Sequence, residues 1–196
     1  MVRQPGAACK SASTKEVSAA GAALSLLELP GLLAQAGIGT LEICHFHFPG
    51  TDPGYLAELR SAATDAGVEL FSVLIDAGDI TQEDPALLER DMAWIRGWMD
   101  VAGAIGASHS RVIPHIRRSA EKLRGLAAYA GERGVQVITE NFHATAGRAD
   151  QLLAILELCE GEVGTCADFG NFKGPDKYDE LAAIAPCSVS AHAKAL

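Results

Sequence analysis

Three apolar stretches in the second half of the chain end on side chains that can bind a metal. Glu140 follows "VQVIT", Asp168 follows "VGTCA" and His192 follows "SVSA". Any one of them alone could be a helix cap, a surface acid or a hydrogen-bonded core histidine. Their repetition at three equivalent positions favours a shared site. Carboxylates together with an imidazole suit one divalent metal ion such as Mn²⁺, Mg²⁺, Co²⁺ or Zn²⁺, so we predict that these three residues bind one.

The residues before each of these positions alternate in character, as expected for strands whose side chains point to opposite faces. The companions on the same face are mostly small or polar, namely Gln136 and Ile138, Gly164 and Cys166, and Ser188 and Ser190. The alternate positions carry branched residues that we expect to pack under helices, namely Val135, Val137 and Val189. This pattern would bring all three ligand side chains to one face of a sheet.

The elements that must position these residues repeat along the chain. The β-rich runs are "EVSAAGA", "TLEICHF", "VELFSVLI", "SHSRVI", "VQVITEN", "VGTCADF" and "CSVSAHA". They recur at intervals of roughly 30 residues, the length of a strand, a helix and two short loops. This alternation predicts a parallel sheet covered by helices, with the chemistry at the carboxyl ends of the strands. A (β/α)8 barrel and an open doubly wound sheet both fit; no GxGxxG or GxxxxGK[ST] motif is present, which favours the barrel.

Two of the intervening segments begin with the same helix-starting signal. Residues 51–67 and 83–106 open with an Asp-Pro pair, in which Asp52 and Asp84 are predicted N-caps. Their apolar residues fall at helical spacing, so we expect four of them to be buried against the sheet: Leu59, Met92, Ile95 and Met99. Residues 115–134 are predicted to form a basic helix with Leu123, Leu126 and Tyr129 facing inward.

Bulk composition limits the classes of protein that are compatible with the sequence. The 196 residues suit one domain, which we place at 15–196 after a loose tail at 1–14. A net charge of −9 argues against nucleic-acid and anionic-membrane partners. No stretch has transmembrane length, and the N-terminus lacks the apolar block of a signal peptide. Five dispersed cysteines without a CxxC pair indicate reduced thiols and a cytoplasmic location.

Four segments resemble the sugar phosphate isomerase/epimerase family, the xylose isomerase-like TIM barrels. They are the region from "LEICHFHFPG" to "IDAGDIT", then "VITENFHA", "CADFGNFKGPDKYDEL" and "SVSAHAKA". The resemblance implies a (β/α)8 barrel with a divalent metal held by Glu, Asp, His and a second Glu from strands five to eight. Its matching residues here are Glu140, Asp168 and His192. The fourth ligand would lie on an eighth strand, which we expect to lie beyond "HAKAL", so the barrel is expected to be truncated.

Such a site suits proton transfer beside a carbonyl group. The resemblance implies an isomerase or epimerase that acts on a sugar or sugar phosphate through an enediolate, with Glu140 as metal ligand and base. Further side chains near the strand ends are candidates for contacting substrate, namely His45, His47, His143, Asn171, Lys173 and Lys194. The expected partner is a small sugar or polyol, and the sequence leaves a homo-oligomer open.

Three alternatives use the same predicted fold. A dehydratase or lyase acting on a polyol would use the same proton abstraction, and a degenerate barrel would only bind a sugar. A hydrolase similar to endonuclease IV would need further His ligands. It is disfavoured because Asn171, and not a histidine, stands three positions after Asp168, and because the chain is acidic.

Overall fold

The computed structural model describes residues 24–113, 119–142 and 146–193, which form strands and helices in alternation. The strands are β1 (Thr40–Cys44), β2 (Glu69–Ile75), β3 (His109–Val112), β4 (Gln136–Glu140), β5 (Gly164–Asp168) and β6 (Ser188–His192). The helices are α1 (Leu29–Gln35), α2 (Pro53–Ala66), α3 (Pro85–Ile105), α4 (Ala120–Gly131), α5 (Ala149–Leu158) and α6 (Lys177–Ile184). Two short 3-10 helices span His45–His47 and Ala185–Cys187. The expected tail and the expected strand "EVSAAGA" lie outside the described residues.

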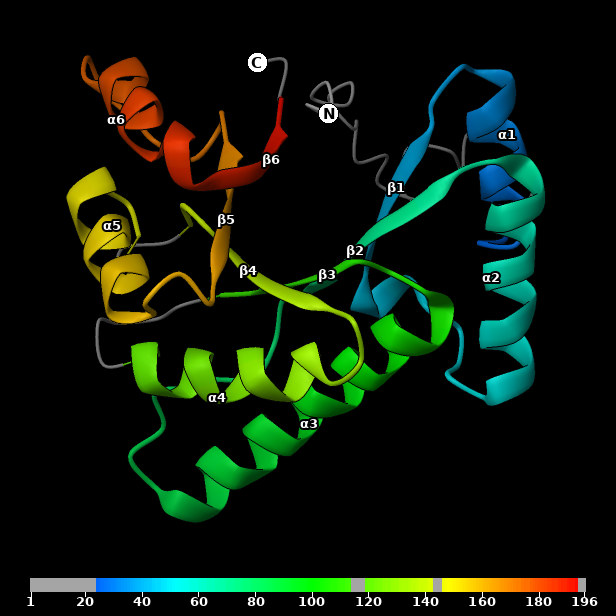
Figure 1. The fold of residues 1–196 in the computed structure, drawn as a ribbon, viewed down its shortest axis with the longest axis horizontal. Coiled ribbons are helices and arrows are strands. Elements are labelled where there is room, and N and C mark those ends of the chain that lie inside the picture. Colours follow the sequence, from blue (N-terminus) through cyan, green and yellow to red (C-terminus); the bar gives the residue numbers. More distant parts are fainter. Residues whose placement is uncertain (1–23, 114–118, 143–145, 194–196) are drawn as a thin grey trace.

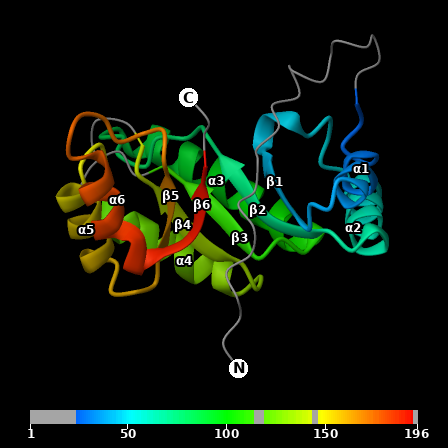
Figure 2. The same ribbon diagram turned by 90° about the horizontal axis from the view of Figure 1, so that it is seen from above.

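The six described strands form one parallel sheet in the order of the sequence, β1 to β6. The sheet is curled, and the helices lie on its outer, convex side (Figures 1 and 2). A doubly wound sheet would instead reverse its strand order and carry helices on both faces. The described part of the chain is therefore the curved wall of a TIM barrel, as predicted, and the doubly wound alternative is wrong.

Side-chain alternation divides the sheet into a helix-facing and a concave face. Ile43, Val73 and Val137 belong to the buried core that also contains Leu59 of α2 and Ile95 of α3. The strand residues between them point the other way, and register keeps them level: Glu42 pairs with Ser72, and Leu74 pairs with Arg111. The hydrophobic core thus lies between sheet and helices, while charged side chains gather on the concave face.

Both Asp-Pro pairs start helices as predicted. The Asp52 side chain accepts a hydrogen bond from Tyr55 N at 2.9 Å, at the start of α2. The Asp84 side chain accepts from Ala86 N at 2.8 Å and from Leu87 N at 3.3 Å, at the start of α3. These bonds satisfy backbone donors that have no partner within the helix.

The apolar faces of these helices are buried with one exception. Leu59, Ile95 and Met99 are completely buried, as predicted. Met92 was also predicted to be buried against the sheet, but it is only partly buried and packs against the core. Leu123 and Leu126 of α4 are buried and Tyr129 is partly so. No helix in the described part of the chain is long and apolar enough to span a membrane.

Candidate metal centre

Glu140, Asp168 and His192 are the last residues of three neighbouring strands, β4, β5 and β6. Each offers one ligand atom, and these atoms all lie within 4.8 Å of one another. His192 Nδ1 is 3.6 Å from Asp168 Oδ2 and 3.9 Å from Glu140 Oε1. All three residues are buried. The expected convergence is therefore present, and the assignment of these residues as metal ligands stays a prediction.

Strand register explains how the three side chains meet. Glu140 pairs with Cys166, so Asp168 stands two residues further along its strand, level with His192. A stagger of this kind accompanies the tilt of strands in a barrel. Because paired residues of parallel strands point to the same side, Glu140, Asp168 and His192 all face the concave side of the sheet.

The predicted packing of branched residues under helices holds at Val135 and Val137 but fails at Val189. Val135 and Val137 lie in the helix-facing core. Val189 does not: it is 43% exposed, and its Cγ1 would lie 3.1 Å from a Cβ added at Gly164. The cause is a register irregularity, since Thr165 pairs with Ser188 while Cys166 pairs with Ser190. One residue of β6 is thereby skipped, and the expectation that Val189 packs under a helix was wrong.

Asp168 is fixed by hydrogen bonds to the neighbouring strand end and to the following turn. The Asn141 side chain donates to Asp168 O at 3.0 Å and accepts from Asp168 N at 2.7 Å. Gly170 N donates to Asp168 Oδ1 at 2.6 Å. With Oδ1 held by the turn, Oδ2 is the oxygen directed toward His192.

Both oxygens of Glu140 also have partners. Oε1 accepts a 2.9 Å hydrogen bond from the Asn171 side chain, and Oε2 lies 3.2 Å from Arg111 Nε. The Arg111 side chain is only 6% exposed, and its Nη1 lies 2.5 Å from Asp76 Oδ1. A buried guanidinium between two carboxylates sets the position of each of them.

His192 contacts a further carboxylate through its second ring nitrogen. Its Nε2 contacts Glu42 Oε2, on β1. Burial by itself lowers the pKa of His192, but hydrogen bonds with Asp168, Cys166, Glu140 and Glu42 outweigh it, so the pKa of His192 is raised. The imidazole is therefore surrounded by the carboxylates of Glu42, Glu140 and Asp168.

The charges of this cluster fit a divalent cation. Glu42, Glu140 and Asp168 are buried and Asp76 is exposed, against the buried guanidinium of Arg111 and the imidazole of His192. An excess of buried negative charge is costly unless a cation compensates it. Two carboxylates and one imidazole nitrogen at mutual ligand distance are a donor set suited to such an ion. The cluster therefore suggests a site for a divalent metal ion.

The residues proposed to contact substrate are placed differently from one another. Asn171 touches Glu140, whereas Lys173 is exposed and its Nζ donates to Gly170 O. His45 and His47 belong to the 3-10 helix after β1, where the chain turns. His45 Nδ1 accepts from Asp76 N at 3.2 Å, and its ring packs edge-on against two tryptophans. Their substrate contacts stay predictions. His143 and Lys194 lie outside the described residues.

Sequence reasoning did not assign Glu42, Asp76 and Arg111 to the site. A usable signal was present in each case. Glu42 stands between Leu41 and Ile43 inside an apolar strand, and a charged group in that setting is buried only with a partner. Arg111 stands directly before Val112 and Ile113 in the expected strand "SHSRVI", and Asp76 directly follows the last residue of β2.

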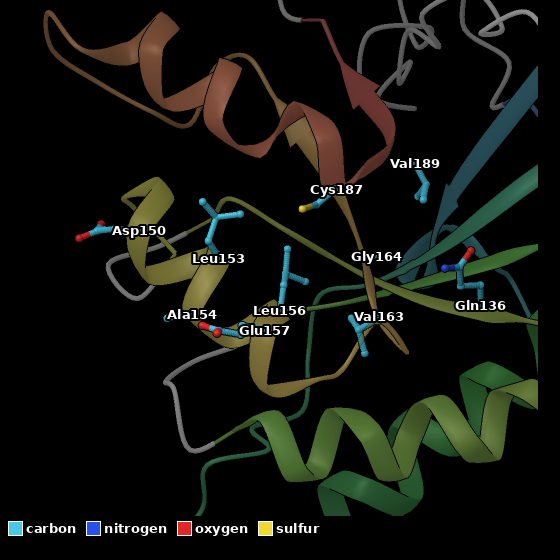
Figure 3. Close-up of a pocket in the computed structure, with 11 residues that line it drawn as sticks. Gln136, Asp150, Leu153, Ala154, Leu156, Glu157, Val163, Gly164, Cys187 and Val189 are labelled. Atoms are coloured by element: carbon cyan, nitrogen blue, oxygen red, sulfur yellow. The ribbon is translucent and has the colours of Figure 1, made fainter.

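A cavity of about 720 Å³ is lined by residues none of which is a candidate ligand (Figure 3). Its lining includes Gln136 and Gly164, the first residues of β4 and β5, together with side chains of α5 such as Leu153. It therefore opens at the amino ends of the strands, opposite to the edge where the three candidate ligands meet. TIM-barrel enzymes carry their chemistry at the carboxyl edge, so we do not assign this cavity to the site.

Comparison with known proteins identifies the family. Residues 30–191 match the family model of the xylose isomerase-like TIM barrels. The chain belongs to this family. No curated protein sequence gives a significant match to the chain.

Several solved structures share the fold at low sequence identity. D-psicose 3-epimerase from Clostridium cellulolyticum H10, crystallised with D-tagatose, has a TM-score of 0.75 and 15% identity over 86% of this chain. A probable 3-DHS dehydratase from Bacillus anthracis has a TM-score of 0.72 and 13% sequence identity over 88% of this chain. A xylose isomerase-like protein from Mycobacterium smegmatis, in complex with magnesium, has a TM-score of 0.69 and 18% sequence identity over 86% of this chain. The alignments cover 67%, 68% and 65% of those three chains.

Proposed function

We propose that this xylose isomerase-like protein is a divalent-metal-dependent sugar isomerase or epimerase. The observation that carries the proposal is the buried convergence of Glu140, Asp168 and His192 at the carboxyl edge of the sheet. The epimerases among the structural neighbours support the same reaction class. The substrate would be a small ketose or aldose, with or without a phosphate group.

In this mechanism Glu140 removes a proton from the carbon beside the substrate carbonyl. A bound divalent ion would polarise the carbonyl and the adjacent hydroxyl and so acidify that carbon. Asn171 and Arg111 hold the two oxygens of Glu140 so that its carboxylate has a fixed direction. Return of a proton to the opposite face epimerises the substrate, whereas its return to the neighbouring carbon isomerises it. Removal of a proton by a positioned carboxylate accounts for about 10²–10⁴ in rate.

A second candidate is a dehydratase acting on a polyol-derived ketone. The similarity to the probable 3-DHS dehydratase, with a TM-score of 0.72, favours it specifically. The first step would be the same proton removal by Glu140. The electron pair left on carbon would then expel a hydroxyl group from the next carbon, and one water would leave for each double bond formed.

Product analysis on the full chain tests the proposal. Protein stripped with a chelator is incubated with ketoses, ketose phosphates and cyclic hydroxyketones, with and without Mn²⁺, Mg²⁺, Co²⁺ or Zn²⁺. We expect an epimer or isomer to form only with added metal and to be lost in Asp168→Asn. An unsaturated product would support the dehydratase. Sugar binding without turnover would leave a barrel that only binds, contrary to both enzymatic proposals.

A further inference from the structure

The contact between Glu42 and His192 joins the two end strands of the described sheet. β1 and β6 are not neighbours in the strand order, and the two residues are 150 positions apart. Both side chains are nevertheless inside the molecule, at 3% exposure for Glu42 and 10% for His192. A carboxylate this well buried is stable only with a close partner, and Glu42 has that partner in the imidazole.

The two nitrogens of His192 face different groups. Nδ1 lies toward Asp168 Oδ2 and Glu140 Oε1, at 3.6 and 3.9 Å. Nε2 contacts Glu42. Glu42 is not among the three residues whose ligand atoms lie close to one another. It therefore meets the imidazole from the side away from the candidate metal position and is placed beside a ligand without being one.

We propose that Glu42 is a positioning residue that fixes the tautomer and the direction of the His192 ring. A ring nitrogen that binds a cation carries no hydrogen, so a neutral imidazole that uses Nδ1 must carry its hydrogen on Nε2. The Glu42 carboxylate accepts that hydrogen and stabilises this tautomer over the other. This inference rests on the proposed function, because it assumes that His192 binds the metal through Nδ1.

A role limited to linking β1 with β6 would have different consequences. It would make Glu42 important for stability while leaving the choice of ring nitrogen and the metal affinity unaffected. A carboxylate that orients a metal-binding histidine also strengthens the ligand, and its loss typically lowers metal affinity or activity about 10–100-fold. Metal affinity and the state of the ring, measured apart from stability and from turnover, therefore distinguish the two roles.

The test uses the full chain and three substitutions. Glu42→Leu removes the acceptor. Glu42→Gln keeps the shape and an acceptor oxygen but loses the charge. Glu69→Gln is the matched control, because Glu69 is an exposed glutamate at the amino end of the neighbouring strand β2. Zn²⁺ affinity is measured by titration calorimetry, and the His192 nitrogens of the Zn²⁺-loaded protein are assigned by long-range ¹H–¹⁵N NMR. Circular dichroism checks the fold.

We expect the wild type to show Zn²⁺ on Nδ1 and hydrogen on Nε2. Glu42→Leu should lose about 10–100-fold in affinity and show a mixture of ring states. Glu42→Gln should keep the hydrogen on Nε2 and lose less Zn²⁺ affinity than Glu42→Leu. This variant provides the test if Glu42→Leu does not fold. Wild-type affinity and ring state in both variants would overturn the inference and leave the metal site standing. A wild type that binds no Zn²⁺, Mn²⁺, Mg²⁺ or Co²⁺ would instead overturn the proposed function and this inference with it.

Discussion

Asn171 donates a 2.9 Å hydrogen bond from its side-chain amide to Oε1 of Glu140, a residue 31 positions earlier in the chain. Asn171 follows β5 in the turn that also supplies the Gly170 N–H to Asp168. One turn thus holds two of the three candidate ligands. A hydrogen bond to an ionised carboxylate is stronger than one between neutral groups, so this contact restricts the direction of Glu140.

Asn171→Leu should weaken metal binding because leucine has a similar size but no donor. We expect a loss of about 10–100-fold in Mn²⁺ affinity, the usual effect of removing a group that holds a ligand. Lys173→Ala is the control from the same turn, since its exposed ammonium contacts a backbone carbonyl and not a candidate ligand. Titration with Mn²⁺ measures both. Equal affinities for Asn171→Leu and wild type would remove Asn171 from the site.

Arg111→Met should destabilise the metal-free protein by roughly 3–5 kcal/mol, because it leaves buried Glu140 without its cationic partner. Arg124→Met is the comparison: it removes only exposed ion pairs with Glu160 and Glu162 and should have little effect. Urea unfolding in the presence of a chelator gives the difference. Excess Mn²⁺ should then stabilise Arg111→Met more than wild type, since it replaces a lost positive charge. If Mn²⁺ instead stabilised the wild type more than Arg111→Met, the proposed charge balance would be contradicted.

The two methionines of α3 should respond differently to a charge. Met99→Asp buries an unpaired carboxylate in the core and should cost on the order of 3–5 kcal/mol of unfolding free energy. Met92→Asp should cost clearly less, because that side chain is only partly buried and its carboxylate can reach water. Urea unfolding of both variants is the measurement. Equal losses of unfolding free energy in the two variants would mean that Met92 is as fully buried as Met99 in solution.

Much of the fold is predictable because it depends on local signals. Asp52 and Asp84 followed by proline mark helix starts whatever the rest of the chain does, and both residues cap as expected. The candidate ligands were identified because the carboxyl ends of parallel strands share one edge, so residue type at three strand ends is enough. Neither inference needs any knowledge of how far the sheet curls.

The contacts that support the site depend on that curvature and on register. Glu42 reaches His192 only because the sheet brings its end strands toward each other, which no local pattern encodes. The irregularity beside Val189 moves one side chain to the other face, and strict alternation cannot foresee it. His45 leaves the strand for a 3-10 turn and contacts the backbone of Asp76. Each of these outcomes is decided by packing between distant segments.

Glu140→Gln tests most directly the proposal that Glu140 removes the proton beside the substrate carbonyl. The amide is nearly isosteric, so the fold should survive, but it cannot accept a proton at neutral pH. Full-length wild type and variant are incubated with ketoses in D₂O containing Mn²⁺ or Mg²⁺, and deuterium incorporation is followed by NMR. We predict exchange at that carbon by the wild type and a rate lower by at least about 10²–10⁴ in the variant. Exchange by Glu140→Gln at the wild-type rate would contradict the claim.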